Sequence, residues 1–157
     1  MREGDAAVST IISRRETSVS DTVWFTCTRE TYRPASSPDV RWLDIPDDIP
    51  HLNGMWRETG SALTEAEWRQ IAADGYTYAG VILEGRLISV AAVFKFSEDA
   101  WMLAAVGTSE PFRRRGLAKQ TCSFVTGYIL DHVPTATCGT RSTNDAMIRT
   151  AKSIGFQ

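Results

Sequence analysis

One stretch of this sequence, residues 104–118, limits the fold more than any other part of the chain. It reads Ala-Ala-Val-Gly-Thr-Ser-Glu-Pro-Phe-Arg-Arg-Arg-Gly-Leu-Ala, so an apolar, strand-like segment ends at Val106 and is followed by a polar turn and three arginines. An amphipathic helix pattern begins directly after Gly116, and Pro134 must end it. A strand, a basic loop and a helix in this order predict backbone N–H groups that hold a phosphate.

The composition predicts an ordinary globular domain. Of the 157 residues, 43% are hydrophobic and 23% are charged, as is typical of such domains. The net charge of −2 gives no basic field that attracts nucleic acid or an anionic membrane. No apolar run approaches the roughly 18 residues of a membrane span, and Arg14-Arg15 interrupts Val8–Ile12 before a signal-peptide core forms. We therefore expect neither nucleic acid nor a membrane as a partner.

The cysteines and histidines form no metal-binding pattern. Three cysteines and two histidines are widely spaced along the chain, without the paired spacing of a zinc site. They are Cys27, Cys122, Cys138, His51 and His132. We expect no metal and a reducing, cytoplasmic setting.

The pattern of the remaining chain predicts a mixed α/β domain at residues 40–157, preceded by an N-terminal extension at 1–39. The extension contains one strand-like segment, Thr22–Thr28, and a linker-like segment, Pro34–Pro38. The domain reads as a βαα–βββ–α–β–α order. Its expected elements are a strand at 40–45, a helix opened by residues 46–48, a second helix from the Thr64/Glu67 capping box to Gly75, strands at 76–83, 86–96 and 101–106, a helix after Gly116, a strand at 136–141, and a helix capped by Asn144 and stopped by Gly155.

Two of these segments resemble known signatures. Arg113–Ala118 fits the Arg/Gln-x-x-Gly-x-Gly/Ala motif, and Asn144–Phe156 is similar to an Asn-initiated helix that ends in Gly-Phe. Both are signatures of the GCN5-related N-acetyltransferase (GNAT) family, whose fold is a mixed sheet flanked by helices. The detailed resemblance covers residues 76–156, residues 40–75 match in pattern only, and residues 1–39 do not match.

The end of the chain departs from the family. Strand material normally follows Gly-Phe and completes the family's sheet, whereas this sequence stops at Gln157, so the last strand or strands are expected to be missing. We expect Thr22–Thr28 to cover the exposed edge, either in its own subunit or in a partner, where a homodimer would form through the edge strand.

The resemblance implies acetyl-coenzyme A as donor and the amine of a small molecule or peptide as acceptor. In this interpretation the amides of the Arg113–Lys119 loop cradle the pyrophosphate, assisted by the helix dipole, while Gly116 and Ala118 keep the backbone accessible. Backbone groups of Val106 and Thr108 hold the pantetheine arm, and Asn144 either reaches that arm or only caps its helix. The predicted site residues are Val106, Thr108, Arg113, Arg114, Arg115, Gly116, Leu117, Ala118, Lys119 and Asn144.

No catalytic residue is predicted. The acidic residue that serves as general base in many family members would fall near Met102, where this sequence has no Asp or Glu. Glu98 and Asp99 lie just upstream, and they either act as a base through water or belong to a hairpin turn. The usual tyrosine that protonates the leaving thiolate would fall at Ala151, although such a thiolate can take its proton from water. Direct acetyl transfer is therefore the leading hypothesis, and a coenzyme A-binding sensor or subunit without catalysis is the alternative.

Several other polar residues allow two interpretations. Cys138 lies beside the expected acceptor channel or is a small buried thiol, and both histidines read as surface or helix-end residues. Asp47, Asp48 and Glu58 attract a cationic acceptor or form a solvated helix face. Nucleic-acid binding through the Arg113–Arg115 run lacks an accompanying basic face or aromatic platform.

Overall fold

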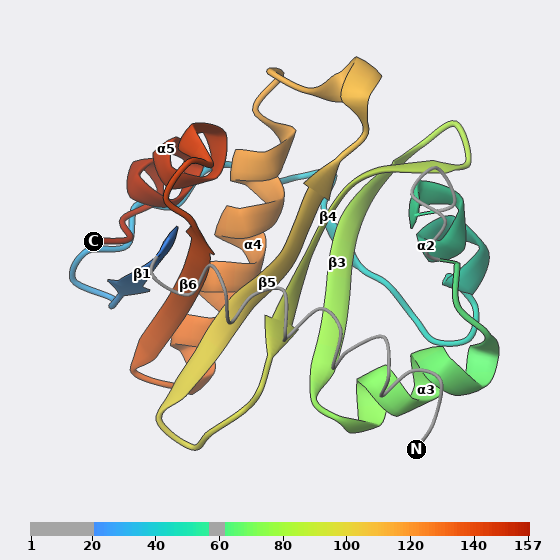
Figure 1. Ribbon diagram of the computed structural model, residues 1–157, viewed down its shortest axis with the longest axis horizontal. Helices are drawn as coiled ribbons and strands as arrows, with labels where there is room; N and C mark the ends of the chain where they lie inside the picture. Colours follow the sequence, from blue (N-terminus) through green and yellow to red (C-terminus); the bar gives the residue numbers. More distant parts are fainter. Residues whose placement is uncertain (1–20, 57–61) are drawn as a thin grey trace.

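The computed structural model describes residues 21–56 and 62–157, which form one six-stranded sheet with helices packed on it (Figure 1). The sheet order is β1-β6-β5-β4-β3-β2, and all neighbours are antiparallel except β5 and β6. The elements are β1 (Thr22–Cys27), β2 (Arg41–Trp42), α2 (Ile49–Trp56), α3 (Glu65–Ala73), β3 (Tyr76–Leu83), β4 (Arg86–Phe94), β5 (Ala100–Thr108), the 3-10 turn η3 (Glu110–Phe112), α4 (Leu117–His132), β6 (Thr135–Arg141) and α5 (Asp145–Ser153). The predicted order of elements is confirmed.

Two predictions about individual strands are wrong in part. The strand expected at 40–45 pairs only at Arg41–Trp42. The strand expected to be buried at 101–106 is longer, Ala100–Thr108, and only Leu103 within it is fully buried. The reason is that the second half of β5 borders an open cleft, so that its apolar residues face a ligand-sized space rather than a helix.

Successive residues of the central strands pack into two separate cores. Ile88 and Ala91 of β4 face α4, whereas Leu87 and Val90 of the same strand face α2 and α3. From Val90 to Val93 the faces alternate with the two-residue period of a strand. Leu87 and Val90 share a core although they are three residues apart, because the register between β3 and β4 shifts at Ile88. In Figure 1, α4 lies behind the sheet and α2 and α3 lie beside β3. The described helices include none that is long and apolar enough to cross a membrane.

The N-terminal segment completes the sheet within its own chain. Strand β1 pairs antiparallel with β6 from Thr22↔Arg141 to Cys27↔Ala136. On the other side of β1, Thr26 exchanges two backbone hydrogen bonds with Gln157, of 3.0 and 2.8 Å. The strand predicted to cover the open edge therefore does so in its own subunit.

The chain that leads into the expected linker, and the first part of the linker at Ala35, contact the helices. The Tyr32 hydroxyl donates to the Ser123 carbonyl at 2.7 Å, and the Ala35 N–H donates to the Ser123 hydroxyl at 2.8 Å. The Arg33 N–H also donates to the Ile154 carbonyl, at 2.9 Å. A domain boundary between residues 39 and 40 stays a prediction.

Candidate functional site

The site begins where two parallel strands separate. β5 and β6 are paired only over Ala100–Met102 and Thr135–Thr137, and beyond these residues the strands diverge. The space between them is a cleft of about 820 Å³, within the range of about 300–1,000 Å³ that ligand sites occupy. Its walls are the second half of β5, the loop into α4, the end of β6 and the first turns of α5.

Nine of the ten predicted site residues line this cleft. They are Val106, Thr108, Arg113, Arg114, Gly116, Leu117, Ala118, Lys119 and Asn144. The tenth, Arg115, is not among the lining residues. Its guanidinium lies over the Phe112 ring, at 5.4 Å from the ring centre. The structure therefore brings together residues from three separate parts of the sequence.

The backbone of the loop that enters α4 is open to the cleft at Gly116. Arg114 and Gly116 have positive φ angles of 64° and 78°, and Gly116 is the N-cap of α4. A Cβ atom on Gly116 would meet no heavy atom within 4 Å. The N–H groups of the first helical turn have no partner within the helix, and they border this open space. The residues present thus fit a bound phosphate group.

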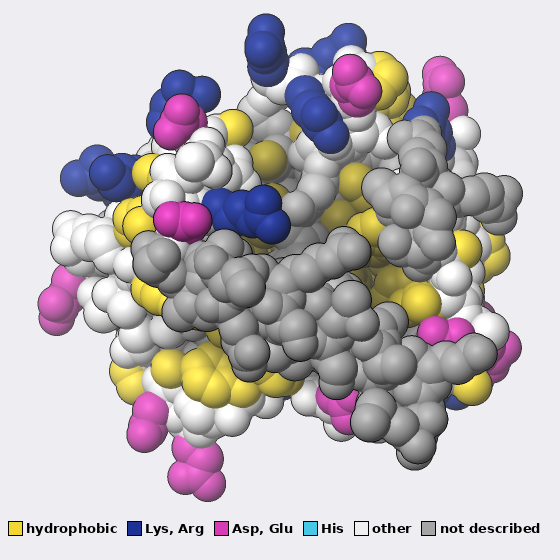
Figure 2. Space-filling model, viewed as in Figure 1, with side chains coloured by type: hydrophobic (Ala, Val, Ile, Leu, Met, Phe, Trp, Pro, Cys, Tyr) yellow, Lys and Arg dark blue, Asp and Glu magenta, His cyan; other side chains and the backbone are white. Residues whose placement is uncertain are grey.

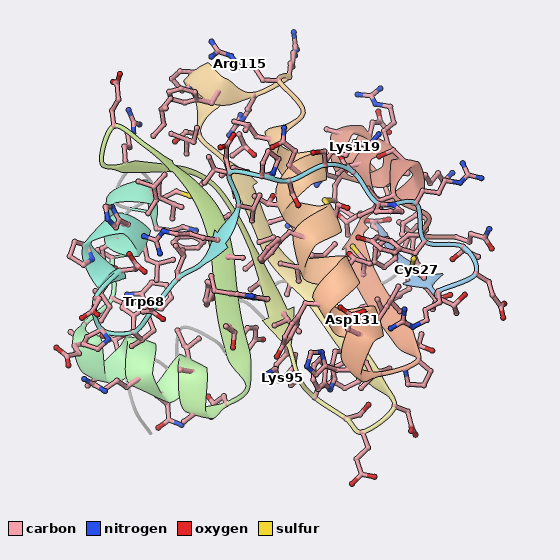
Figure 3. The ribbon with its side chains drawn as sticks, turned by 180° about the vertical axis from the view of Figure 1, so that it is seen from behind. Cys27, Trp68, Lys95, Arg115, Lys119 and Asp131 are labelled. Atoms are coloured by element: carbon pink, nitrogen blue, oxygen red, sulfur yellow. The ribbon has the colours of Figure 1, made fainter. Side chains whose placement is uncertain are left out.

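Positive charge surrounds the same loop. Arg113, Arg114, Lys119 and Arg149 line the cleft, and the first turn of α4 contains no acidic residue. None of these cations forms an ion pair with a carboxylate in the described part of the chain. Lys and Arg side chains gather along the upper edge of Figure 2, and Figure 3 shows Lys119 near the start of α4. Cationic side chains and the helix dipole together favour an anionic ligand.

Arg113 also has a structural contact. Its Nε donates to the Thr108 carbonyl at 3.0 Å, which joins the loop to the end of β5. The sequence predicts that Asn144 either reaches the donor's arm or only caps its helix. It lines the cleft, yet its side-chain oxygen accepts from the Met147 N–H at 3.2 Å and its Nδ2 donates to the Thr140 hydroxyl at 3.1 Å.

A β-bulge shapes the deep part of the cleft. The register pairs Ala104 and Gly107 of β5 with Ala92 and Val90 of β4, so β5 has one residue more than its partner. Ala105 in this bulge has a φ of 51°. A bulge leaves backbone groups outside the ladder and bends its strand, and here it does so at the cleft wall. The sequence contains no signal for it, because alanine rarely adopts a left-handed conformation.

The cleft has few groups suited to proton transfer. Its lining in the described structure includes no Asp, Glu, His or Tyr. Cys138 lines it, and burial raises the pKa of this thiol to about 11. Cys138 is therefore protonated at neutral pH, which fits the interpretation as a buried thiol. Ala151, at the position expected for tyrosine, is fully buried.

The remaining candidates lie elsewhere or have structural partners. Glu98 and Asp99 occupy the turn before β5, at the opposite end of this strand from the cleft. His132 ends α4 and stacks on Trp101, and His51 lies 3.9 Å from Asp48. Glu58 is outside the described residues.

Both predictions for Asp48 are wrong. Its carboxylate is buried, accepts two hydrogen bonds from Arg41 at 2.9 and 3.0 Å, and accepts the Asp44 N–H at 2.7 Å. These bonds, with Arg41 first, lower the pKa of Asp48. The carboxylate closes the turn between β2 and α2, so it is not a free group that attracts a cation. Asp47 is exposed.

The sequence reasoning missed the wall that α5 and β6 supply. The cleft is lined there by Gly139, Thr140, Met147, Arg149 and Thr150, in addition to the loop at residues 109–116 that enters α4, which we call the phosphate loop. The period of α5 signals only which residues face inward, and it does not show that part of this helix borders a space.

An open cleft between diverging parallel strands ends in a basic loop at the start of α4, an arrangement that fits a phosphate-bearing ligand. Residues 38–156 match the model of the acetyltransferase (GNAT) family. The chain belongs to this family. A comparison with curated proteins gives no match.

Solved structures share the fold. A protein from Novosphingobium aromaticivorans, described as an acetyltransferase of the GNAT family, has a TM-score of 0.69 at 20% identity over 87% of this chain and 59% of its own. A GNAT acetyltransferase from Colwellia psychrerythraea has a TM-score of 0.69 at 15% identity over 87% of this chain and 52% of its own. The chain thus spans a little over half the length of these two proteins.

A shorter structure matches almost completely. The aminoglycoside N-acetyltransferase AAC(6')-Iy, solved in complex with CoA, has a TM-score of 0.61 at 20% identity. The match covers 76% of this chain and 91% of that one. At these identities the likeness is one of fold.

Proposed function

We propose that this chain transfers an acetyl group from acetyl-coenzyme A to the amine of a small molecule or peptide. The observation that carries the proposal is the cleft where β5 and β6 diverge, because its mouth combines an open amide loop at Gly116 with the cations Arg113, Arg114 and Lys119. This arrangement supports the pyrophosphate of the donor at the loop, with its arm running along β5 towards the bulge at Ala105.

In the proposed reaction the neutral amine attacks the thioester carbonyl directly. A C–N bond forms, the C–S bond breaks, and coenzyme A leaves as a thiolate. The amine gives up a proton, and the thiolate takes one. Because no acidic or phenolic side chain in the described structure lines the cleft, we assign both proton transfers to water. A lysine-like amine, with a pKa of about 10.4, then reacts faster as the pH rises.

The buried thiol argues against a covalent acetyl-enzyme. A cysteine is nucleophilic as its thiolate, and burial raises the pKa of Cys138 to about 11. Direct transfer therefore fits the cleft better than a two-step reaction through this side chain. The alternative function, a coenzyme A-binding sensor or subunit, is favoured by the same lack of acid and base groups.

The acceptor class rests on the relatives. The bound analogue in one solved structure of AAC(6')-Iy joins CoA to an acetylneamine, so a small polyamine-like acceptor is the first class to test. Dimerisation and a cytoplasmic setting stay predictions of the sequence.

Two measurements test these functions. We expect coenzyme A and acetyl-coenzyme A to raise the melting temperature, while a short oligonucleotide leaves it unchanged. We expect release of free thiol from acetyl-coenzyme A when an amine panel is added. If coenzyme A binds but no amine of the panel causes thiol release, the sensor function is supported instead. If neither coenzyme A nor acetyl-coenzyme A binds, both functions are refuted.

A further inference from the structure

Two buried hydroxyl groups and a third that lines the cleft meet where the loop at residues 109–116 leaves the sheet. The Ser89 Oγ of β4 lies 3.2 Å from the Thr108 Oγ1 at the end of β5 and 3.4 Å from the Thr121 Oγ1 of α4. Ser89 and Thr121 are completely buried. Thr108 lines the cleft. We call these three residues the hydroxyl cluster.

The geometry allows an order of donors and acceptors that uses every hydroxyl proton of the cluster. In this order the Thr121 hydroxyl donates to a carbonyl of its own helix, that of Leu117 at 3.2 Å or of Ala118 at 3.1 Å. Ser89 then donates to Thr121 and accepts from Thr108. The hydrogen bonds connect the cleft wall to the first turn of α4.

The cluster brackets the loop that carries the site. Residues 109–116 leave the sheet directly after Thr108 and enter α4 at Leu117. The loop is tied at its start by the Ser109 N–H, which donates to the Ile88 carbonyl at 2.9 Å. The hydroxyl cluster connects that same point of the sheet to the helix turn at the other end of the loop. Because loop amides bind an anion only when they converge, the separation of the two ends matters for affinity.

We propose that the hydroxyl cluster is a positioning device that holds the amides of the phosphate loop in the geometry that binds coenzyme A. The inference rests on the proposed function, since it names what keeps that function's donor site in shape. Ser89 and Thr121 are not among the residues that line the cleft, so they act through the loop. Buried hydroxyls cost free energy unless they are paired, and their pairing here fixes three elements at one point.

The chain offers a matched control on the same helix. Thr126 is as fully buried as Thr121, but its hydroxyl has no hydrogen-bond partner among the described residues. Thr121→Val and Thr126→Val make the same change, hydroxyl to methyl, at two buried positions of α4. Only the first interrupts the cluster.

The test compares coenzyme A affinity, measured by calorimetry, with melting temperature for both variants and for Ser89→Ala. We expect Thr121→Val to raise the Kd for coenzyme A by about tenfold, which corresponds to about 1.4 kcal/mol, and Ser89→Ala to raise it in the same direction. Thr126→Val should leave the Kd unchanged. Thr121→Ser, which keeps the hydroxyl, should restore most of the affinity.

The outcomes separate the two proposals. If the unmodified protein binds coenzyme A and Thr121→Val and Ser89→Ala lower only the melting temperature, the cluster is merely structural and this inference is wrong. If Thr121→Val does not fold, Ser89→Ala against Thr126→Val decides the same question. If the unmodified protein fails to bind coenzyme A, the proposed function itself is wrong.

Discussion

Gly116 gives the sharpest test of the phosphate loop, because a second glycine of the chain provides an internal control. Gly116 has a φ of 78° and Gly85, in the turn between β3 and β4, has a φ of 75°. A Cβ atom added at either position would meet nothing within 4 Å. Replacement by alanine therefore changes the backbone energy at both sites in the same way and causes no clash within the protein.

The expected loss of stability is small and equal for the two variants. A left-handed residue other than glycine costs about 1–2 kcal/mol, which lowers the melting temperature of a chain of this size by about 2–8 °C. The expected loss of affinity differs. Gly116 lines the cleft, so we expect the added methyl group of Gly116→Ala to hold the phosphates off the loop amides, whereas Gly85 is not among the residues that line the cleft.

The affinity change follows from the hydrogen bonds lost. One hydrogen bond to a charged group contributes about 1.5–3 kcal/mol, so losing one raises the Kd for coenzyme A by about 10- to 150-fold. Titration calorimetry at fixed salt concentration measures the Kd for coenzyme A of each variant, and thermal unfolding is measured in parallel. Equal affinities in Gly116→Ala and Gly85→Ala would show that Gly116 serves only the turn, and the reasoning about the amide cradle would be refuted.

Three further changes test other parts of the structure. Asp48→Asn should lower the free energy of unfolding at neutral pH by about 1–3 kcal/mol, because it weakens a charge-assisted contact with Arg41. Since the folded pKa of Asp48 is lowered, this stability is present above the unfolded pKa and is lost as the pH falls through the folded value, so urea unfolding of variant and parent should converge in acid. Cys138→Ala should keep thiol release from acetyl-coenzyme A measurable, and a complete loss in a folded variant would point to an acetyl-cysteine intermediate. Gly155→Ala should destabilise by more than about 2 kcal/mol, because Gly155 has a φ of 106° and a Cβ there would overlap the Thr31 carbonyl; a melting temperature like that of the parent would contradict this packing.

Features that depend on a few neighbouring residues were predictable. The Thr64 capping box is present with Glu67, and Asn144 caps α5 through the Met147 N–H. Helix α4 begins at Leu117, directly after Gly116, as predicted. Each of these is a contact or dihedral angle within about one helical turn, so the residue types alone indicate it.

Features that join distant segments were not predictable. Ser89 and Thr121 are 32 residues apart, and nothing in either local pattern marks them as partners. Asp48 reads as a surface acid until the fold places the Arg41 side chain beside it. The bulge at Ala105 has no residue preference to reveal it, since it comes from the register between β4 and β5.

The sequence by itself determined the family and the loop proposed to hold the donor, because the Arg113–Ala118 motif and the Asn144–Phe156 helix are local patterns whose spacing carries their meaning. Only the tertiary structure decided that β5 and β6 part to form a cleft and that β1 covers the sheet edge within its own subunit, beside Gln157. β1 and β6 pair although they are more than a hundred residues apart in the sequence. The register of such a pair follows from packing across the whole sheet, which no local pattern reveals.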